Sequence, residues 1–201
     1  MQDLVNTGGI PEYVLNKDRN YLISLVDDII SKDIIAFHNI KNKALIKDYF
    51  LLLTERAGKQ ISLNKIANIL KISSDTAGRY LTFFEETYLI HLVSHYGKTN
   101  QKILSPKKIY LADLGIKNVF TGFKDKGSLF ENYVYLQIKH LFPFYVLEKG
   151  IEIDFITSRQ ELIEVKYHSN LNQKQQKLFD QFKARKKVII KNNEELEKWI
   201  K

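Results

Sequence analysis

The segment 151–168, IEIDFITSRQELIEVKYH, constrains the fold most, because apolar and charged residues alternate in two short runs around a polar centre. Alternation with a period of two is typical of β-strands, whose side chains point to opposite faces in turn. If Ser-Arg-Gln at 158–160 is a loop, Phe155 pairs with Ile163. We therefore expect an antiparallel hairpin.

This register separates apolar from charged side chains. Asp154 lies opposite Glu164, and Glu152 lies opposite Lys166. A one-residue slip would mix Asp154 with apolar residues, so the hydrophobic pattern selects the register. Opposed carboxylates repel each other unless their face is wet, one acid is protonated or a cation lies between them. The expected apolar face comprises Ile151, Ile153, Phe155, Ile163, Val165 and Tyr167.

Two interpretations of the charged face remain. Two carboxylates, completed by water and by phosphate oxygens of a substrate, are ligands that Mg²⁺ prefers. Lys166, about 7 Å along the strand from Glu164, would orient the attacking water or stabilise charge on the scissile phosphate. The alternative is a solvent-facing strand pair whose charges share no task. Flanking helices favour the first interpretation, because they should cover part of each face.

Helix and strand patterns through the rest of the chain predict an α/β (α+β) fold. We expect N-terminal helices over 1–42, a winged helix-turn-helix over 43–102 and a small α/β domain with a mixed sheet over 103–201.

The helix-turn-helix is predicted from spacing, since only Lys-Ile-Ser at 71–73 separates the second helix from the third. The third helix presents Thr76 and Arg79, and the guanidinium of Arg79 suits guanine or a phosphate. Two strands around Gly-Lys-Thr-Asn at 97–100 would form the wing. The lysines expected to lie along DNA are Lys98, Lys102, Lys107 and Lys108. The alternative is a winged helix that serves as a protein-interaction or spacer module.

GIEIDF, IEVK and the ten-position spacing from Asp154 to Glu164 resemble the PD-(D/E)XK nuclease superfamily. The resemblance implies Mg²⁺ or Mn²⁺ held by Asp154 and Glu164, with Lys166 assisting the attacking water. A helix before the acidic strand often supplies a further carboxylate in that superfamily, and Glu131 matches its place. Alternatively, Ser128 and Glu131 form a capping box, which explains this glutamate without a metal.

Motifs in order along nearly the whole chain resemble the C-terminal region of archaeal and bacterial P-loop ATPases of the AAA superfamily. They are GGIPEY, SKDI, SLNKIANILKISSDTAGRYLTFFEETYLI, SPKKIYLADLGI, GSLFENYV and GIEIDF…LIEVK. The resemblance implies a winged helix and a nuclease-like domain after an ATPase module, with residues 1–42 as its end and connector. No G-x-x-x-x-G-K-[ST] occurs, so we expect no ATP site here. The ATPase would be a separate or fused partner, and the chain is either truncated or has lost its motor.

A formal charge of +8 would attract a polyanion such as DNA, although it also serves solubility. No apolar run approaches the roughly 20 residues of a membrane span. The absence of cysteine and of a signal-peptide pattern suits a cytoplasmic protein. We expect a DNA-binding protein with a candidate metal-dependent endonuclease site. The alternatives are a DNA-binding or targeting module that does not cleave, and a protein-binding domain.

Overall fold

The computed structural model describes residues 7–122 and 125–200, which fold into two compact units. Among the described residues, each unit is built from two stretches of chain: 7–92 with 109–122, and 93–108 with 125–200. These units cross the boundary that the sequence indicated near residue 102.

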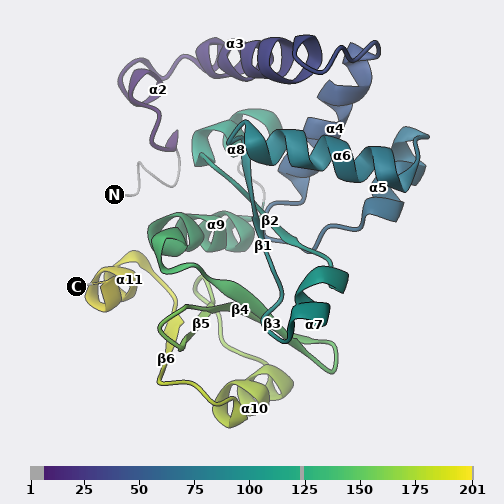
Figure 1. The fold of residues 1–201 in the computed structure, drawn as a ribbon. Helices are drawn as coiled ribbons and strands as arrows, with labels where there is room; N and C mark the ends of the chain where they lie inside the picture. Colours follow the sequence, from purple (N-terminus) through teal and green to yellow (C-terminus); the bar gives the residue numbers. More distant parts are fainter. Residues whose placement is uncertain (1–6, 123–124, 201) are drawn as a thin grey trace. The chain divides into compact units, whose positions relative to one another are not determined.

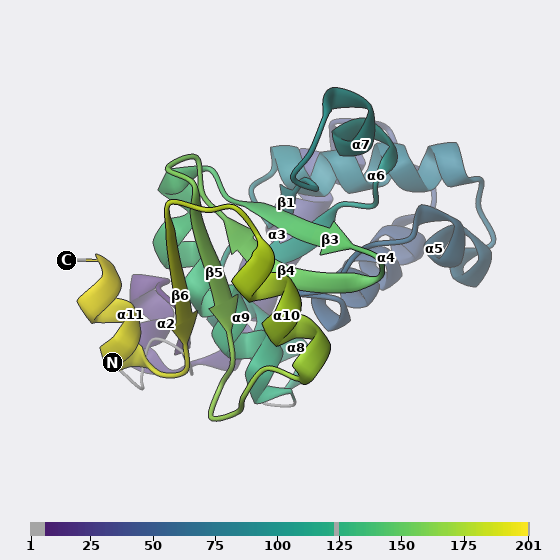
Figure 2. The same cartoon turned by 90° about the horizontal axis from the view of Figure 1, so that it is seen from below.

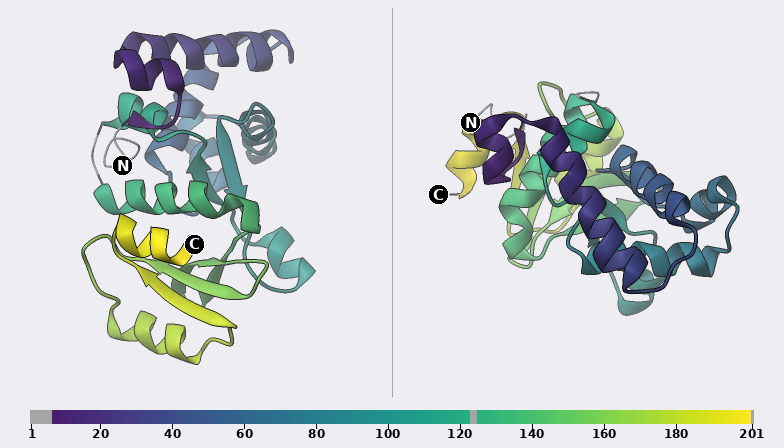
Figure 3. Two further views of the ribbon diagram at one scale, coloured as in Figure 1. Left: turned by 90° about the vertical axis from the view of Figure 1, so that its left-hand side faces the viewer. Right: turned by 90° about the horizontal axis from the view of Figure 1, so that it is seen from above.

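The first unit is helical apart from the strands at its junctions. Its elements are α2 (Pro11–Asn16), α3 (Arg19–Ile29), the π-helix η1 (Ile30–Ala36), α4 (Lys43–Glu55), α5 (Leu63–Leu70), α6 (Ser74–Glu86) and α8 (Leu114–Thr121). The helices α3 and η1 continue as one helix (Figure 3), on which Leu22, Val26 and Ile30 are buried. A two-stranded sheet pairs β1 (Ile90–Val93) with β2 (Lys108–Leu111).

The two helices and the short turn of the predicted helix-turn-helix are present. Helix α5 ends at Lys71, which adopts the left-handed conformation with φ 55°, and Ser73 caps α6 by accepting the N–H of Thr76 at 3.1 Å. The wing differs from the expectation, because helix α7 (Thr99–Leu104) replaces the tight turn between β1 and β2. Gln101 accounts for this helix, since its side chain accepts the N–H of Lys98 at 3.0 Å.

Two distant motifs of the first unit meet at the start of α8. The Asp113 carboxylate caps this helix through the N–H of Ile116 at 3.1 Å and also accepts the N–H of Gly9 at 2.6 Å. Gly8 adopts φ +70°, and a Cβ there would overlap the same carboxylate, so only glycine fits. The sequences GGIPEY and LADLGI therefore form one structural contact.

The second unit is a four-stranded sheet with helices on both faces (Figure 1). Its elements are α7, α9 (Lys126–Ile138), the short 3₁₀ helix η2 (Lys139–Leu141), β3 (Phe144–Glu148), β4 (Ile151–Ile156), β5 (Glu161–Val165), α10 (Gln173–Gln181), β6 (Lys186–Ile190) and α11 (Asn193–Ile200). The strands lie in the order β3-β4-β5-β6, with α10 on one face and α9 on the other (Figure 2).

Strands β3, β4 and β5 are antiparallel, whereas β6 is parallel to β5. This arrangement confirms the predicted α/β fold with a mixed sheet. The predicted hairpin is also confirmed, because Phe155 pairs with Ile163 and Ile156 with Leu162.

A β-bulge interrupts β4 at the acidic residue. Phe144 and Val146 of β3 pair with Ile156 and Ile153 of β4, so one intervening residue of β3 lies opposite two of β4. The extra residue lies at or beside Asp154. Bulges of this kind redirect a side chain and often lie next to functional sites.

The bulge also changes the predicted apolar face. Ile153 joins Ile156 and Phe179 of α10 in one apolar cluster, whereas Phe155 stacks with Tyr135 of α9 at a centroid distance of 6.2 Å. The expectation that Ile153 and Phe155 share a face was therefore wrong, because strict alternation does not continue through a bulge.

In the described parts of the chain, no helix combines the length and the apolar character needed to cross a membrane.

Candidate functional site

The hairpin brings Asp154 and Glu164 together, as its predicted register requires. The backbone N–H of Asp154 donates to Glu164 Oε2 at 3.2 Å, and the N–H of Val165 donates to Asp154 Oδ2 at 2.9 Å. The two carboxylates thus serve as acceptors for the backbone N–H groups of Asp154 and Val165. Each carboxylate is held by the strand that carries the other.

Lys166 completes this group, because its Nζ lies 2.6 Å from Glu164 Oε1. Glu164 is only 1% exposed, and burial, followed by repulsion from Asp154, raises its pKa to about 8. Burial lowers the pKa of Lys166, but its hydrogen bond to Glu164 and the nearby carboxylates raise it above the usual value overall. Burial and the neighbouring Asp154 carboxylate therefore both oppose ionisation of Glu164.

A second ammonium group, that of Lys108, was missed in the sequence. Its Nζ lies 2.8 Å from Glu131 Oε1, 2.5 Å from Glu152 Oε1 and 3.0 Å from Asp154 Oδ1. The residue is 1% exposed, so the expectation that it lies along DNA was wrong. The burial of every residue of β2 explains the error, since a lysine at this position must point into the protein.

Lys107, its neighbour, instead donates to Ser94 Oγ at 2.7 Å.

Glu131 reaches this site because α9 begins earlier than expected. Asp125 caps the helix by accepting the N–H of Ser128 at 3.1 Å, so Ser128 lies inside the first turn. The capping-box explanation of Glu131 was therefore wrong. Its carboxylate binds Lys108 instead.

Glu152 and Gln175 also border the acid pair. Glu152, expected opposite Lys166, instead binds Lys108. Gln175 Nε2 of α10 lies 3.4 Å from Glu164 Oε1 and from the carbonyl oxygen of Glu152. The hairpin sequence did not predict the contact with Gln175. This residue lies on α10, and the alternation pattern of the strands does not indicate where α10 packs.

The composition of the cluster fits a divalent cation. Four carboxylates face two ammonium groups, which leaves a formal charge of −2 when every acid is ionised. Carboxylate oxygens suit Mg²⁺ and Mn²⁺. Within residues 7–122 and 125–200, no three acidic or imidazole side chains are arranged to hold a metal ion. The Lys108 ammonium lies among three of the acids. Asp154 and Glu164 are the pair that would hold it, with water and phosphate oxygens.

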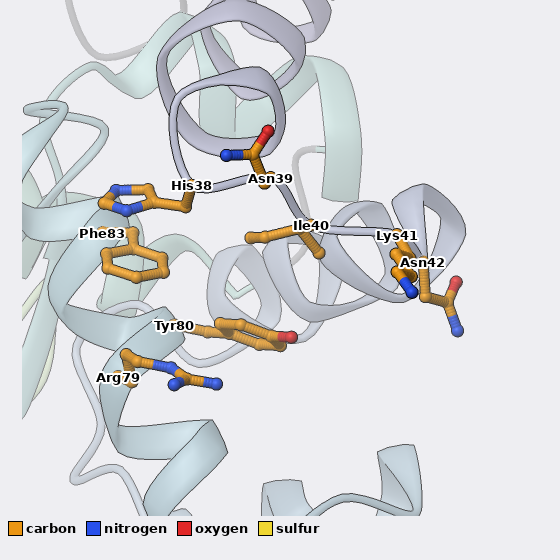
Figure 4. Close-up of a pocket in the computed structure, with 8 residues that line it drawn as sticks. All are labelled: His38, Asn39, Ile40, Lys41, Asn42, Arg79, Tyr80 and Phe83. Carbon is orange, nitrogen blue, oxygen red and sulfur yellow. The ribbon is translucent and has the colours of Figure 1, made fainter.

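Arg79 lies exposed on α6 at the rim of a pocket of about 480 Å³ (Figure 4). Its Cζ lies 5.8 Å from the centroid of the Tyr80 ring, and the His38 ring stacks on Phe83 at 3.5 Å. Lys41 adds a second cation to the rim. The pocket therefore combines cations with aromatic rings, which suits phosphates and bases.

The other residues expected to bind DNA lie in different settings. Thr76 accepts a hydrogen bond from Ser73 Oγ at 2.9 Å within the helix cap, beside Arg79 in the first unit. Lys98 and Lys102 belong to the second unit, where Lys102 Nζ lies 4.4 Å from the centroid of the Phe144 ring.

Comparisons with known proteins place the chain in a family. The family described as Domain of unknown function (DUF8612) matches residues 1–127, a region that ends before Glu131. Uncharacterized protein MJ1544 of Methanocaldococcus jannaschii is 32% identical over 225 residues, which cover 98% of this chain and 51% of that protein. The chain thus spans about half the length of this relative. No solved structure matches the chain. The chain belongs to the family described as Domain of unknown function (DUF8612).

Proposed function

We propose that the protein binds DNA and hydrolyses its phosphodiester bonds with a divalent cation held by Asp154 and Glu164. The observation that carries this proposal is that each carboxylate accepts a backbone N–H of the opposite strand, Glu164 from Asp154 at 3.2 Å and Asp154 from Val165 at 2.9 Å. Lys166 Nζ lies 2.6 Å from Glu164. Burying two adjacent carboxylates is costly, and such arrangements gather at functional sites.

Each residue has a distinct task in this proposal. The bound cation would polarise the phosphate and lower the pKa of a bound water. Asp154 and Glu164 are held in place by each other's strands, which keeps their oxygens oriented. The Lys166 ammonium, beside Glu164, would orient the attacking water or stabilise charge on the scissile phosphate.

Arg79 and Lys41 would bind DNA phosphates in the first unit, and the rings of Tyr80 and Phe83 would contact a base. The order of motifs along the chain supports an ATPase of the AAA superfamily, separate or fused, as the partner. The absence of cysteine suits action in the cytoplasm.

A second candidate is a DNA-binding or targeting module that does not cleave. It is favoured by Lys108, whose ammonium lies 3.0 Å from Asp154 Oδ1 and neutralises part of the charge that would attract a cation.

Nicking of plasmid DNA and cleavage of linear duplex with Mg²⁺ or Mn²⁺ test the proposal. We expect Asp154→Asn and Lys166→Met each to reduce cleavage at least about 100-fold, since positioned groups of this kind contribute that much. Asp180→Asn, an exposed aspartate of α10, is the matched control and should cleave normally. Cleavage that survives Asp154→Asn would place the activity elsewhere. Salt-sensitive binding without cleavage would support the second candidate.

A further inference from the structure

Lys108 is a fully enclosed cation of the cluster, with 1% of its surface exposed. Its Nζ has carboxylate oxygens at 2.8, 2.5 and 3.0 Å, one from α9 and two from β4. Lysine is almost never fully buried unless it is paired. Here three acids surround one ammonium, whereas a single acid would be enough to neutralise it.

Three carboxylate oxygens surround one point, and the Lys108 ammonium fills it. Oxygen ligands lie 2.3–2.6 Å from Ca²⁺ and about 2.1 Å from Mg²⁺. The oxygens of Glu131 and Asp154, at 2.8 and 3.0 Å from Nζ, would need to move about 0.2–0.4 Å closer to reach Ca²⁺ distances. The ammonium therefore occupies a position that three acids would otherwise offer to a divalent cation.

We propose that Lys108 is the resident cation of this cluster and takes the place of a second divalent ion. The site then binds one divalent ion, at Asp154 and Glu164, while the Lys108 ammonium holds Glu131, Glu152 and the other oxygen of Asp154. The inference deepens the proposed function, because it rests on the same carboxylates and sets how many ions they take. It makes Lys108 a positioning residue, which acts on Asp154 through one oxygen of its carboxylate.

Counting bound ions tests this inference without any cleavage assay. The full 201-residue chain is titrated with Mn²⁺, followed by electron paramagnetic resonance, and with Ca²⁺, followed by calorimetry. We expect one ion for the wild type and two for Lys108→Met. Lys139→Met, at an exposed lysine of the same unit, is the matched control and should bind one. Adding Glu131→Gln to Lys108→Met should remove the additional ion.

The two proposals fail in different ways. No ion in the wild type but one in Lys108→Met would support the role of Lys108 and contradict the cation at Asp154 and Glu164. Equal counts in the two proteins, or two ions in the wild type, would overturn the inference.

Binding of Mn²⁺ should also affect the stability of Lys108→Met. Lys108→Met removes the ammonium that contacts three acids, so Mn²⁺ should raise the melting temperature of the variant more than that of the wild type. A variant that stays unfolded at saturating Mn²⁺ would also overturn the inference, because the ion should replace the ammonium.

Discussion

Replacing Glu164 with glutamine should stabilise the metal-free protein at alkaline pH. The pKa of Glu164 is raised from 4.5 to about 8 by burial and by repulsion from Asp154. The folded state therefore keeps a proton on this acid between these two pH values, whereas the unfolded chain loses it. Because the folded state binds more protons in this window, the wild type loses stability as pH rises from about 4.5 to 8.

The size of the effect follows from the shift. One pKa unit corresponds to 1.36 kcal/mol, so a rise from 4.5 to about 8 costs on the order of 5 kcal/mol above pH 8. Glutamine carries no charge at any pH and avoids this cost. The free energy of unfolding of Glu164→Gln, minus that of the wild type, should therefore grow by about 4 kcal/mol from pH 5 to pH 9, since part of the change already occurs below pH 5. A change in side-chain packing caused by the substitution shifts this difference by the same amount at every pH.

Urea unfolding between pH 5 and 9, with EDTA present to remove divalent ions, measures this difference. Glu194→Gln, at an exposed position of α11, is the control, and its difference from the wild type should stay flat from pH 6 to 9. A flat difference for Glu164→Gln as well would refute the reasoning, since the carboxyl would then ionise without cost. Mn²⁺ at 100 times its Kd should return about 2.7 kcal/mol to the wild type at pH 8, and less to the variant.

Three further substitutions test other parts of the account. Asp113→Ala leaves two backbone N–H groups without their acceptor and should lower the free energy of unfolding, measured in urea, by about 2 kcal/mol. Asp113→Asn keeps an acceptor oxygen and should retain most of the wild-type stability in the same assay. Gly115→Ala places a Cβ against a backbone carbonyl oxygen and should cost about 1–3 kcal/mol in the same assay, and an unchanged midpoint would contradict the close contact. Arg79→Ala should weaken DNA binding about tenfold and reduce the salt slope by about one in fluorescence anisotropy, while Lys139→Ala at equal charge change should do neither.

The sequence predicted best those features that depend on neighbouring residues and on the burial of apolar side chains. The register that pairs Phe155 with Ile163 follows from burying apolar side chains, and the same pattern alone brings Asp154 to Glu164. The two helices of the predicted helix-turn-helix are local as well, because Ser62 and Ser73 cap them by accepting N–H groups three residues ahead.

The residues that the sequence did not reveal depend on contacts between distant segments. Lys108 lies 46 positions before Asp154, and its charge indicated an exposed residue until the burial of β2 was known. The bulge at Asp154 arises from the pairing of β4 with β3. The alternation of residues within β4 alone does not predict this pairing. A capping box with Ser128 would have explained Glu131 from the local sequence. The structure excludes this explanation, because Asp125 caps the helix and Ser128 lies inside its first turn.

Diffraction from crystals soaked in Mn²⁺, with the anomalous signal used to locate the ion, is the sharpest test of the proposed metal centre. We expect one peak within about 2.5 Å of carboxylate oxygens of both Asp154 and Glu164, with Lys108 still among its three acids. No peak at that pair, or one only at another part of the chain, would contradict the proposed metal centre.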